Sequence, residues 1–209
     1  MPRWLTRLLA PAMHTPPTVP WSAPPRVTRA VLHGIAVEVA NTRPDIATND
    51  VLGRLDTALA LVAEHTPHRL RHLRRDVTRI LVQRYPCRGA YDPATGTCLV
   101  ELTFVVNPAF TPAQVAATIV HEGAHARLHR LGFPLDMTDR ERQERFCRRA
   151  EIEFGRLAPG GAPVVERALA ILTAEGVDVA PRIDPRLAAE RVAAADRAAA
   201  VRPAVPPRA

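Results

Sequence analysis

The chain has 209 residues and a formal net charge of +7. This length allows one domain with a sizeable hydrophobic core and flanking tails. All 28 basic residues are arginines spread through the chain, and aromatic residues make up only 4% of it. Because single-stranded nucleic acids are bound by basic side chains interleaved with aromatic ones, the composition argues against nucleic-acid binding.

The two ends of the chain predict tails. Residues 1–26 predict a disordered proline-rich leader, because Arg7 and Pro11 interrupt the apolar stretch that a signal peptide needs. Residues 179–209 are rich in alanine, arginine and proline, and they predict a frayed helix followed by a disordered tail. No stretch is apolar over the length of a membrane-spanning helix, so we expect no membrane contact.

Three cysteines bear on the cellular compartment: Cys87, Cys98 and Cys147. An odd number of cysteines without Cys-x-x-Cys spacing argues against a disulfide scaffold. It favours a reducing compartment, and we expect a cytoplasmic protein.

Residues 27–178 predict one α+β domain. Apolar residues alternate with polar ones where we expect strands, and recur every three or four residues where we expect helices. Turn residues at 92–96 predict a hairpin between two β-rich segments. The predicted elements are, in chain order, a strand or hairpin over 27–40, a helix over 49–65 capped by Asn49, a short helix over 67–76, a strand over 77–85, a hairpin over 89–108 with its second strand at 97–106, and helices over 111–131, 138–157 and 164–175.

The helix over 111–131 carries the motif HExxH at His121, Glu122 and His125. Helix residues four apart lie on the same face, so the two imidazoles can converge on one metal ion. The carboxylate of Glu122 can then reach a metal-bound water instead of the metal itself. Thr111 and Pro112 suit the helix start, and an apolar stripe predicts that the helix is half-buried.

These residues resemble the zincin metallopeptidases, and more closely the gluzincins, in which a glutamate on a later helix completes a zinc site. Glu144 follows His125 after eighteen residues, the HExxH-x18-E spacing of that group. The stricter metzincin pattern needs a third histidine at position 131, which is Leu131 here. The resemblance covers roughly residues 97–157. It implies a zincin-like α+β fold, in which a small sheet packs on the HExxH helix and on a second ligand-bearing helix.

The third metal ligand is predicted to be Glu144, with Glu151 as the alternative. Seven residues are almost two helical turns, so both carboxylates lie on nearly the same flank of the 138–157 helix. They are about 10 Å apart along the helix axis, too far for one ion to bind both. Glu151 would then accept a hydrogen bond from one imidazole. Cys147 lies between them in projection. It could be a zinc ligand, but a small core residue is the plainer interpretation.

The resemblance gives two further residues a part in the site. Gluzincins often use a tyrosine or histidine to stabilise the oxyanion, and Tyr91 and His129 are the candidates here. Packing for Tyr91 and exposed helix surface for His129 are the plainer interpretations. By the same resemblance, the strand at 97–106 would lie beside a bound peptide and donate backbone hydrogen bonds to it.

The sequence therefore predicts a zinc-dependent hydrolase, specifically a metallopeptidase that uses zinc-bound water with Glu122 as general base. Its ligands would be His121, His125 and Glu144, and its partner a peptide or protein substrate. Two alternatives stay open: a catalytically silent zinc-binding interaction protein, and a basic nucleic-acid-associated domain in which HExxH occurs by chance. The sequence leaves the substrate and the oligomeric state open.

Overall fold

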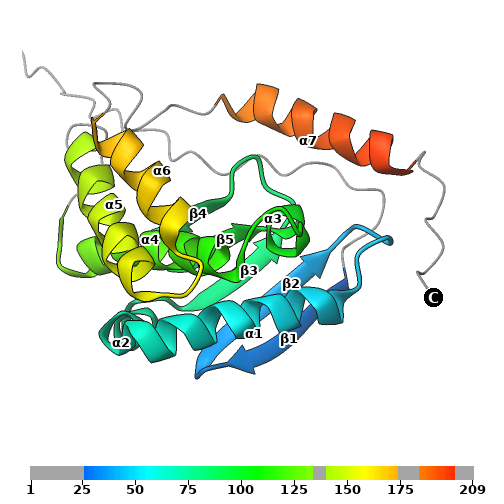
Figure 1. The fold of residues 1–209 in the computed structure, drawn as a ribbon. Helices are drawn as coiled ribbons and strands as arrows, with labels where there is room; N and C mark the ends of the chain where they lie inside the picture. The colour runs from blue at the N-terminus through cyan, green and yellow to red at the C-terminus, as the bar shows by residue number, and fades with distance from the viewer. Residues whose placement is uncertain (1–25, 134–139, 174–183, 201–209) are drawn as a thin grey trace, which may run out of the picture.

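The structure is a computed structural model and describes residues 26–133, 140–173 and 184–200. In these residues the chain forms an α+β fold, as the sequence predicts. It has a mixed five-stranded sheet and seven helices (Figure 1). The elements are, in chain order, β1 (Arg26–Leu32), β2 (Ile35–Asn41), α1 (Thr48–His65), α2 (Pro67–Asp76), β3 (Arg79–Gln83), β4 (Gly89–Asp92), β5 (Thr97–Glu101), α3 (Leu102–Val106), α4 (Pro112–Arg130), α5 (Arg140–Leu157), α6 (Ala162–Thr173) and α7 (Pro185–Ala200).

The strands lie in the order β1-β2-β3-β5-β4. The central pairs β2–β3 and β3–β5 are parallel, whereas β1–β2 and β4–β5 are antiparallel hairpins. Strand β4 is therefore an antiparallel edge strand, which has a neighbour on one side only. From the resemblance to gluzincins, the strand at 97–106 is expected to be the one that lies open to a bound peptide. In the structure that strand, β5, lies between β3 and β4, and β4 is at the edge.

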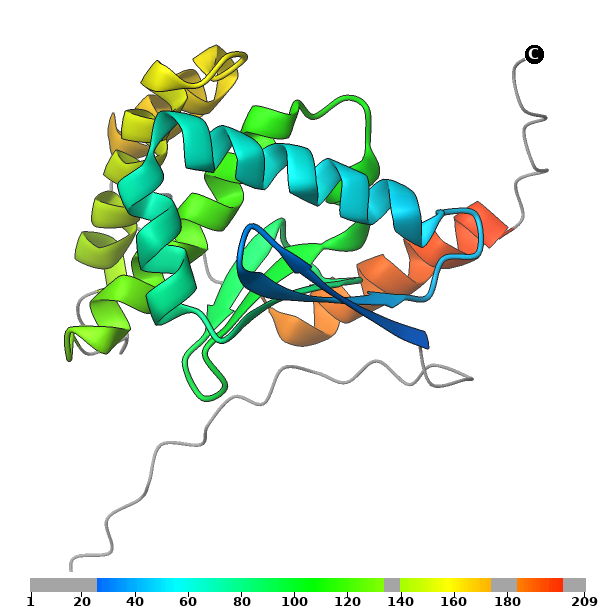
Figure 2. The same cartoon turned by 90° about the horizontal axis from the view of Figure 1, so that it is seen from below.

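Helix α4 is more deeply buried than the half-buried helix that the sequence predicts. It packs against α1, α2 and α5 and against strands β4 and β5. Thirteen of its residues are buried, because alanine, valine and glycine cover most sides of the helix and not one stripe. At Gly123 an added Cβ would lie 2.5 Å from Leu73 Cδ2, so α2 can approach α4 only where the side chain is missing. Figure 2 shows α1 and α2 in front of α4, with which both are in contact.

The predicted strand or hairpin over 27–40 is a hairpin that turns at His33 and Gly34, both with positive φ (49° and 75°). Two local predictions are wrong in detail. Helix α1 follows Ala47 instead of being capped by Asn49. The predicted strand 97–106 ends at Glu101, whose carboxylate accepts a hydrogen bond from Phe104 N and caps the short helix α3.

The C-terminal region contains a helix where the sequence predicts a frayed one. Residues Pro185–Ala200 form helix α7, on the side of the sheet away from α1 (Figure 1). Ala188 and Val192, one turn apart, are buried, and Asp196 forms ion pairs with Arg43 and Arg84. Two small apolar residues and one carboxylate are thus enough to anchor the helix. The predicted leader up to residue 25, and Thr138 as the cap of α5, lie outside the described residues.

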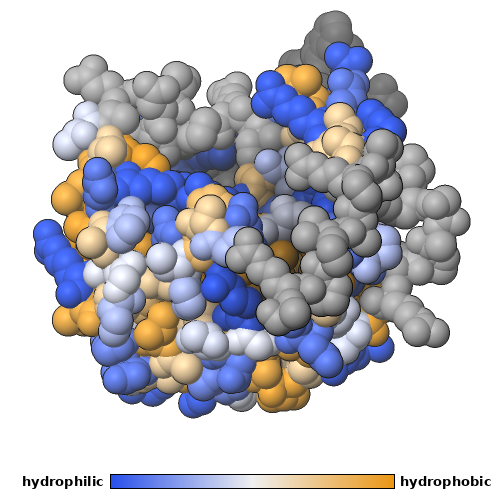
Figure 3. All heavy atoms as spheres, turned by 45° about the vertical axis from the view of Figure 1, so that its right-hand side comes forward, coloured by the Kyte–Doolittle hydropathy of each residue, from blue (hydrophilic) through white to orange (hydrophobic). Residues whose placement is uncertain are grey.

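Within the described ranges, no helix combines the length and the apolar character needed to cross a bilayer. On the face seen in Figure 3, hydrophilic residues are spread over the surface with hydrophobic ones scattered between them. The three cysteines are free thiols, as the sequence predicts.

Candidate metal centre

The local sequence of α4 explains how the two histidines are positioned. Thr111 and Gln114 form a reciprocal capping box, in which each side chain accepts a hydrogen bond from the other residue's backbone N–H. The helix runs without a break from this cap through the motif. His121 and His125 therefore lie one turn apart on the side that faces α5, with their Nε2 atoms 3.2 Å apart.

Glu144, on the second turn of α5, places its carboxylate between the two imidazoles. Its Oε2 lies 3.2 Å from His121 Nε2, and its Oε1 lies 3.4 Å from His125 Nε2. Zinc ligands at 2.0–2.1 Å in a tetrahedral site are separated from one another by about 3.3 Å. The three contacts thus have the spacing of a tetrahedral ligand set.

Glu151 lies on the other side of the His121 ring. Its Oε1 is 2.7 Å from His121 Nδ1, although the ring N–H does not point straight at that oxygen. The two carboxylates of α5 therefore take different places, with Glu144 at Nε2 and Glu151 at Nδ1. This arrangement is the one expected when Glu144 is the ligand and Glu151 orients the ligand's ring.

Arg148 completes the charged face of α5. Its guanidinium lies 2.5 Å from Glu151 Oε1 and 3.7 Å from Glu144 Oε2, and its side chain is only 12% exposed. Glu144 is therefore not part of a surface ion pair with Arg148. Its carboxylate is 13% exposed and faces the histidines.

Cys147 is a further candidate ligand. It is fully buried, and its Sγ lies within 4.8 Å of a nitrogen of both His121 and His125. A buried His–His–Cys group that could hold a metal ion is thus present in the described residues. The sequence places Cys147 between the two glutamates in projection. Only the structure shows how close its sulfur lies to both imidazoles.

Glu122 is buried beside this group but takes no part in it. Within the described part of the chain, its carboxylate forms no hydrogen bond and no ion pair. It lies against the backbone of Gly89 at the start of β4, where an added Cβ would be 3.0 Å from Glu122 Oε1 and 2.6 Å from Thr118 Cγ2. No sequence pattern singles out Gly89, because only the fold brings β4 against α4.

The charges of the centre shift the pKa values of its members. Burial raises the pKa of Glu122, and the nearby imidazoles oppose this rise only in part. Burial lowers the pKa of His121, but Glu144 and Glu151 outweigh burial and bring it to about 9. Burial raises the pKa of Glu144, but hydrogen bonds to both histidines outweigh it, and the net shift is strongly downward.

Tyr91 and His129 are brought together at one end of β4. The Tyr91 hydroxyl lies 3.1 Å from His129 Nδ1, one helical turn beyond His125. Burial raises the pKa of Tyr91, so its hydroxyl stays protonated at neutral pH and can donate a hydrogen bond. Their part in a reaction stays a prediction.

Comparison of the chain with protein-family models, with curated proteins and with solved structures gives no match. The resemblance to gluzincins therefore depends on the motif, on its spacing and on the geometry of the centre. That geometry fits a metal ion: three ligand atoms have tetrahedral spacing, a fourth donor lies close by, and a carboxylate faces the far side of one ring.

Proposed function

We propose that this protein is a zinc-dependent hydrolase that cleaves peptide bonds, with His121, His125 and Glu144 as the zinc ligands. Two imidazoles and one carboxylate are a ligand set typical of catalytic zinc, because they leave one coordination position open. When bound there, the ion would act as a Lewis acid toward a carbonyl oxygen and would lower the pKa of a water molecule to about 7.

The observation that carries the proposal is the buried, unpartnered carboxylate of Glu122. Its oxygens are not among the fully enclosed polar atoms that lack a partner in the described residues, so water can reach the carboxylate, as a general base needs. Burial raises the pKa of Glu122 toward neutral pH. A general base is most effective when its pKa lies near the working pH. In this proposal Glu122 takes a proton from the attacking water and delivers it to the leaving amine.

The other residues of the centre have supporting parts in this proposal. Glu151 orients His121 through Nδ1, and Arg148 keeps Glu151 ionised. The edge strand β4 replaces β5 as the strand on which an extended peptide would lie, because its outer edge has no neighbouring strand. Tyr91, beside His129, would donate a hydrogen bond to the developing oxyanion.

The test combines metal content with hydrolysis. We expect the purified chain to take up one zinc per molecule and to cleave peptides from a mixed pool analysed by mass spectrometry. Glu122→Gln should keep the zinc and lose about two to four orders of magnitude in rate, because an amide cannot accept the proton. His125→Ala should lose the metal. Activity that survives Glu122→Gln unchanged would refute the mechanism.

A second candidate function follows from Cys147. If its sulfur binds the ion together with both histidines and Glu144, all four positions are filled and the site is structural. The protein would then be a catalytically silent zinc-binding protein. The unpartnered Glu122 argues against this closed site, and the state of Cys147 decides between the two functions.

A further inference from the structure

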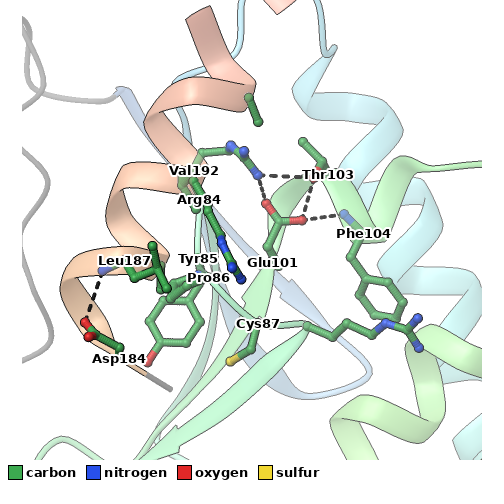
Figure 4. Close-up of a pocket in the computed structure, with 14 residues that line it drawn as sticks. Arg84, Tyr85, Pro86, Cys87, Glu101, Thr103, Phe104, Asp184, Leu187 and Val192 are labelled. Atoms are coloured by element: carbon green, nitrogen blue, oxygen red, sulfur yellow. Dashed lines mark hydrogen bonds and ion pairs between the residues drawn. The ribbon is translucent and has the colours of Figure 1, made fainter. Parts of the chain in front are cut away.

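A pocket of about 570 Å³ lies where helix α7 crosses the ends of β3 and β5 (Figure 4). One wall is the segment 84–88, which joins β3 to β4, and the opposite wall is α7. Much of the lining is apolar and includes Pro86, Phe104, Leu187 and Val192.

The charges in the pocket do not balance. The buried guanidinium of Arg84 forms ion pairs with Glu101 and with Asp196. The carboxylate of Asp184 accepts hydrogen bonds from two backbone N–H groups in the first turn of α7. All acidic groups of the lining are thus already engaged.

Two arginines of the lining are left without a carboxylate. Arg88 lies over the rings of Phe104 and Phe110, with its Cζ 5.3 and 4.4 Å from their centroids. Within the described residues neither Arg88 nor Arg191 forms an ion pair. Burial lowers the pKa of Arg88, and the charge of Glu151 opposes this lowering only in part. The pocket therefore offers two cations without a carboxylate partner, Arg88 against aromatic rings and Arg191 exposed on α7.

The pocket lies next to the proposed catalytic base. The Cys87 thiol, in the pocket wall, donates to the carbonyl oxygen of Gly89 at 3.0 Å. Gly89 in turn lies against Glu122, while Tyr91, at the other end of β4, lies against His129. An extended chain on the outer edge of β4 would pass Glu122 near Gly89 and continue past that end of the strand toward residues 85–88.

We propose that this pocket selects substrates with a carboxylate next to the cleaved bond, held by Arg88 and Arg191 while apolar atoms contact the rest of the lining. The inference depends on the proposed hydrolase function and names its substrate class. The carboxylate has two sources, an aspartate or glutamate side chain or a free C-terminus.

The test uses one peptide that the full zinc-loaded protein cleaves. The residue on either side of the cleaved bond is changed to Glu, Gln or Lys, and each peptide is made with a free or an amidated C-terminus. We expect kcat/KM to be at least about tenfold higher for Glu than for Gln at one position, or for the free over the amidated terminus, as one charge-assisted hydrogen bond implies. A preference for Glu assigns the side chain, and a preference for the free end assigns the terminus.

Arg88→Gln and Arg191→Gln should each reduce that preference about tenfold, whereas Arg71→Gln, at an exposed arginine of α2, should leave it unchanged. Arg88→Gln could unfold because it loses the aromatic contacts. In that case Arg88→Lys, which keeps the charge, takes its place. Hydrolysis without any preference for the carboxylate, or a preference that survives both arginine variants, overturns the proposal and leaves the hydrolase function standing.

A binding measurement separates the two failures. Fluorescence anisotropy of a labelled Glu peptide and its Gln counterpart, with Glu122→Gln protein, needs no catalysis. Tighter binding of the Glu peptide that is lost in Arg191→Gln supports the pocket even if no peptide is ever cleaved. Equal binding of both peptides overturns it.

Discussion

His121 has a carboxylate at each ring nitrogen: Glu151 Oε1 lies 2.7 Å from Nδ1, and Glu144 Oε2 lies 3.2 Å from Nε2. Without a metal ion, this arrangement favours a doubly protonated imidazolium, which is why the pKa of His121 is raised to about 9. A metal ion at Nε2 would take the place of one proton and leave the other on Nδ1, facing Glu151. The two glutamates of α5 should therefore respond differently to mutation.

Glu144→Ala should remove the metal, whereas Glu151→Gln should keep full stoichiometry and weaken the affinity about 10- to 100-fold, the usual effect of losing a residue that orients a ligand. Zinc titration against a competing chelator measures both. Glu153→Gln is the control, because that carboxylate is on the same helix but faces Arg69. If Glu151→Gln empties the site and Glu144→Ala does not, the assignment is reversed.

The sequence predicted α4 and its histidines well because the information is local. The Thr111 cap, Pro112 and the helical spacing of the motif lie within one element. Glu144 could be named only through the spacing of a known family, since the turn between α4 and α5 decides where its carboxylate points. No local pattern distinguishes Glu144 from Glu151.

Features that depend on pairing between distant segments could not be predicted. The order of β4 and β5 in the sheet depends on whether β3 pairs with the first or the second strand of the hairpin, and both strands carry similar residues. The strand at 97–106 was predicted too long because Leu102–Val106 is rich in β-formers, whereas the Glu101 cap favours a helical turn. Helix α7 could be predicted only as a frayed helix, because its buried residues, Ala188 and Val192, are small and give a weak apolar pattern.

Gly89→Ala should disturb the centre without touching a metal ligand. The added methyl group would meet Thr118 Cγ2 at 2.6 Å and Glu122 Oε1 at 3.0 Å, so α4 or β4 must shift. We expect a loss of about 1–3 kcal/mol in the free energy of unfolding and a lower kcat, with zinc stoichiometry retained. Denaturant unfolding and the rate on one peptide measure these effects.

Gly53→Ala provides the matched control for that substitution. Gly53 is on helix α1, and an added Cβ would have no atom within 4 Å. There alanine should stabilise the protein by about 0.5–1 kcal/mol through helix propensity and leave kcat unchanged. Equal behaviour of the two variants would mean that Gly89 does not constrain Glu122.

The stability of the metal-free protein should fall as the pH rises from about 6.5 to 9. Because the pKa of His121 is raised on folding, its ion pairs stabilise the fold fully below the unfolded pKa of about 6.5 and are lost as the pH passes through about 9. The expected loss in the free energy of unfolding is roughly 1–3 kcal/mol. Denaturant titrations in excess chelator at pH 6, 7.5 and 9.5 measure it.

A His121→Asn variant tests whether this dependence belongs to His121. Its free energy of unfolding should change less over the same pH range, since the amide does not titrate. Zinc affinity of the parent should rise over that range, because the ion competes with the proton on Nε2. A metal-free parent whose stability rises between pH 6.5 and 9 would contradict the assigned shift.

Cys147 distinguishes an open, catalytic centre from a closed, structural one. Burial raises the pKa of its thiol well above the ordinary value, and the negative charges of Glu144, Glu122 and Glu151 add to this effect. A thiol must lose its proton to bind a metal ion, a step that the ion itself favours and that burial and the three carboxylates oppose. We expect the fourth position to stay open. Cobalt(II) in place of zinc makes the difference visible, because thiolate ligation produces charge-transfer absorption in the near ultraviolet. The cobalt protein should lack that band, and Cys147→Ala should change neither the spectrum nor the zinc affinity by more than a few-fold. If the parent shows the band and Cys147→Ala loses it, the centre is closed and the hydrolase proposal gives way to a structural zinc site.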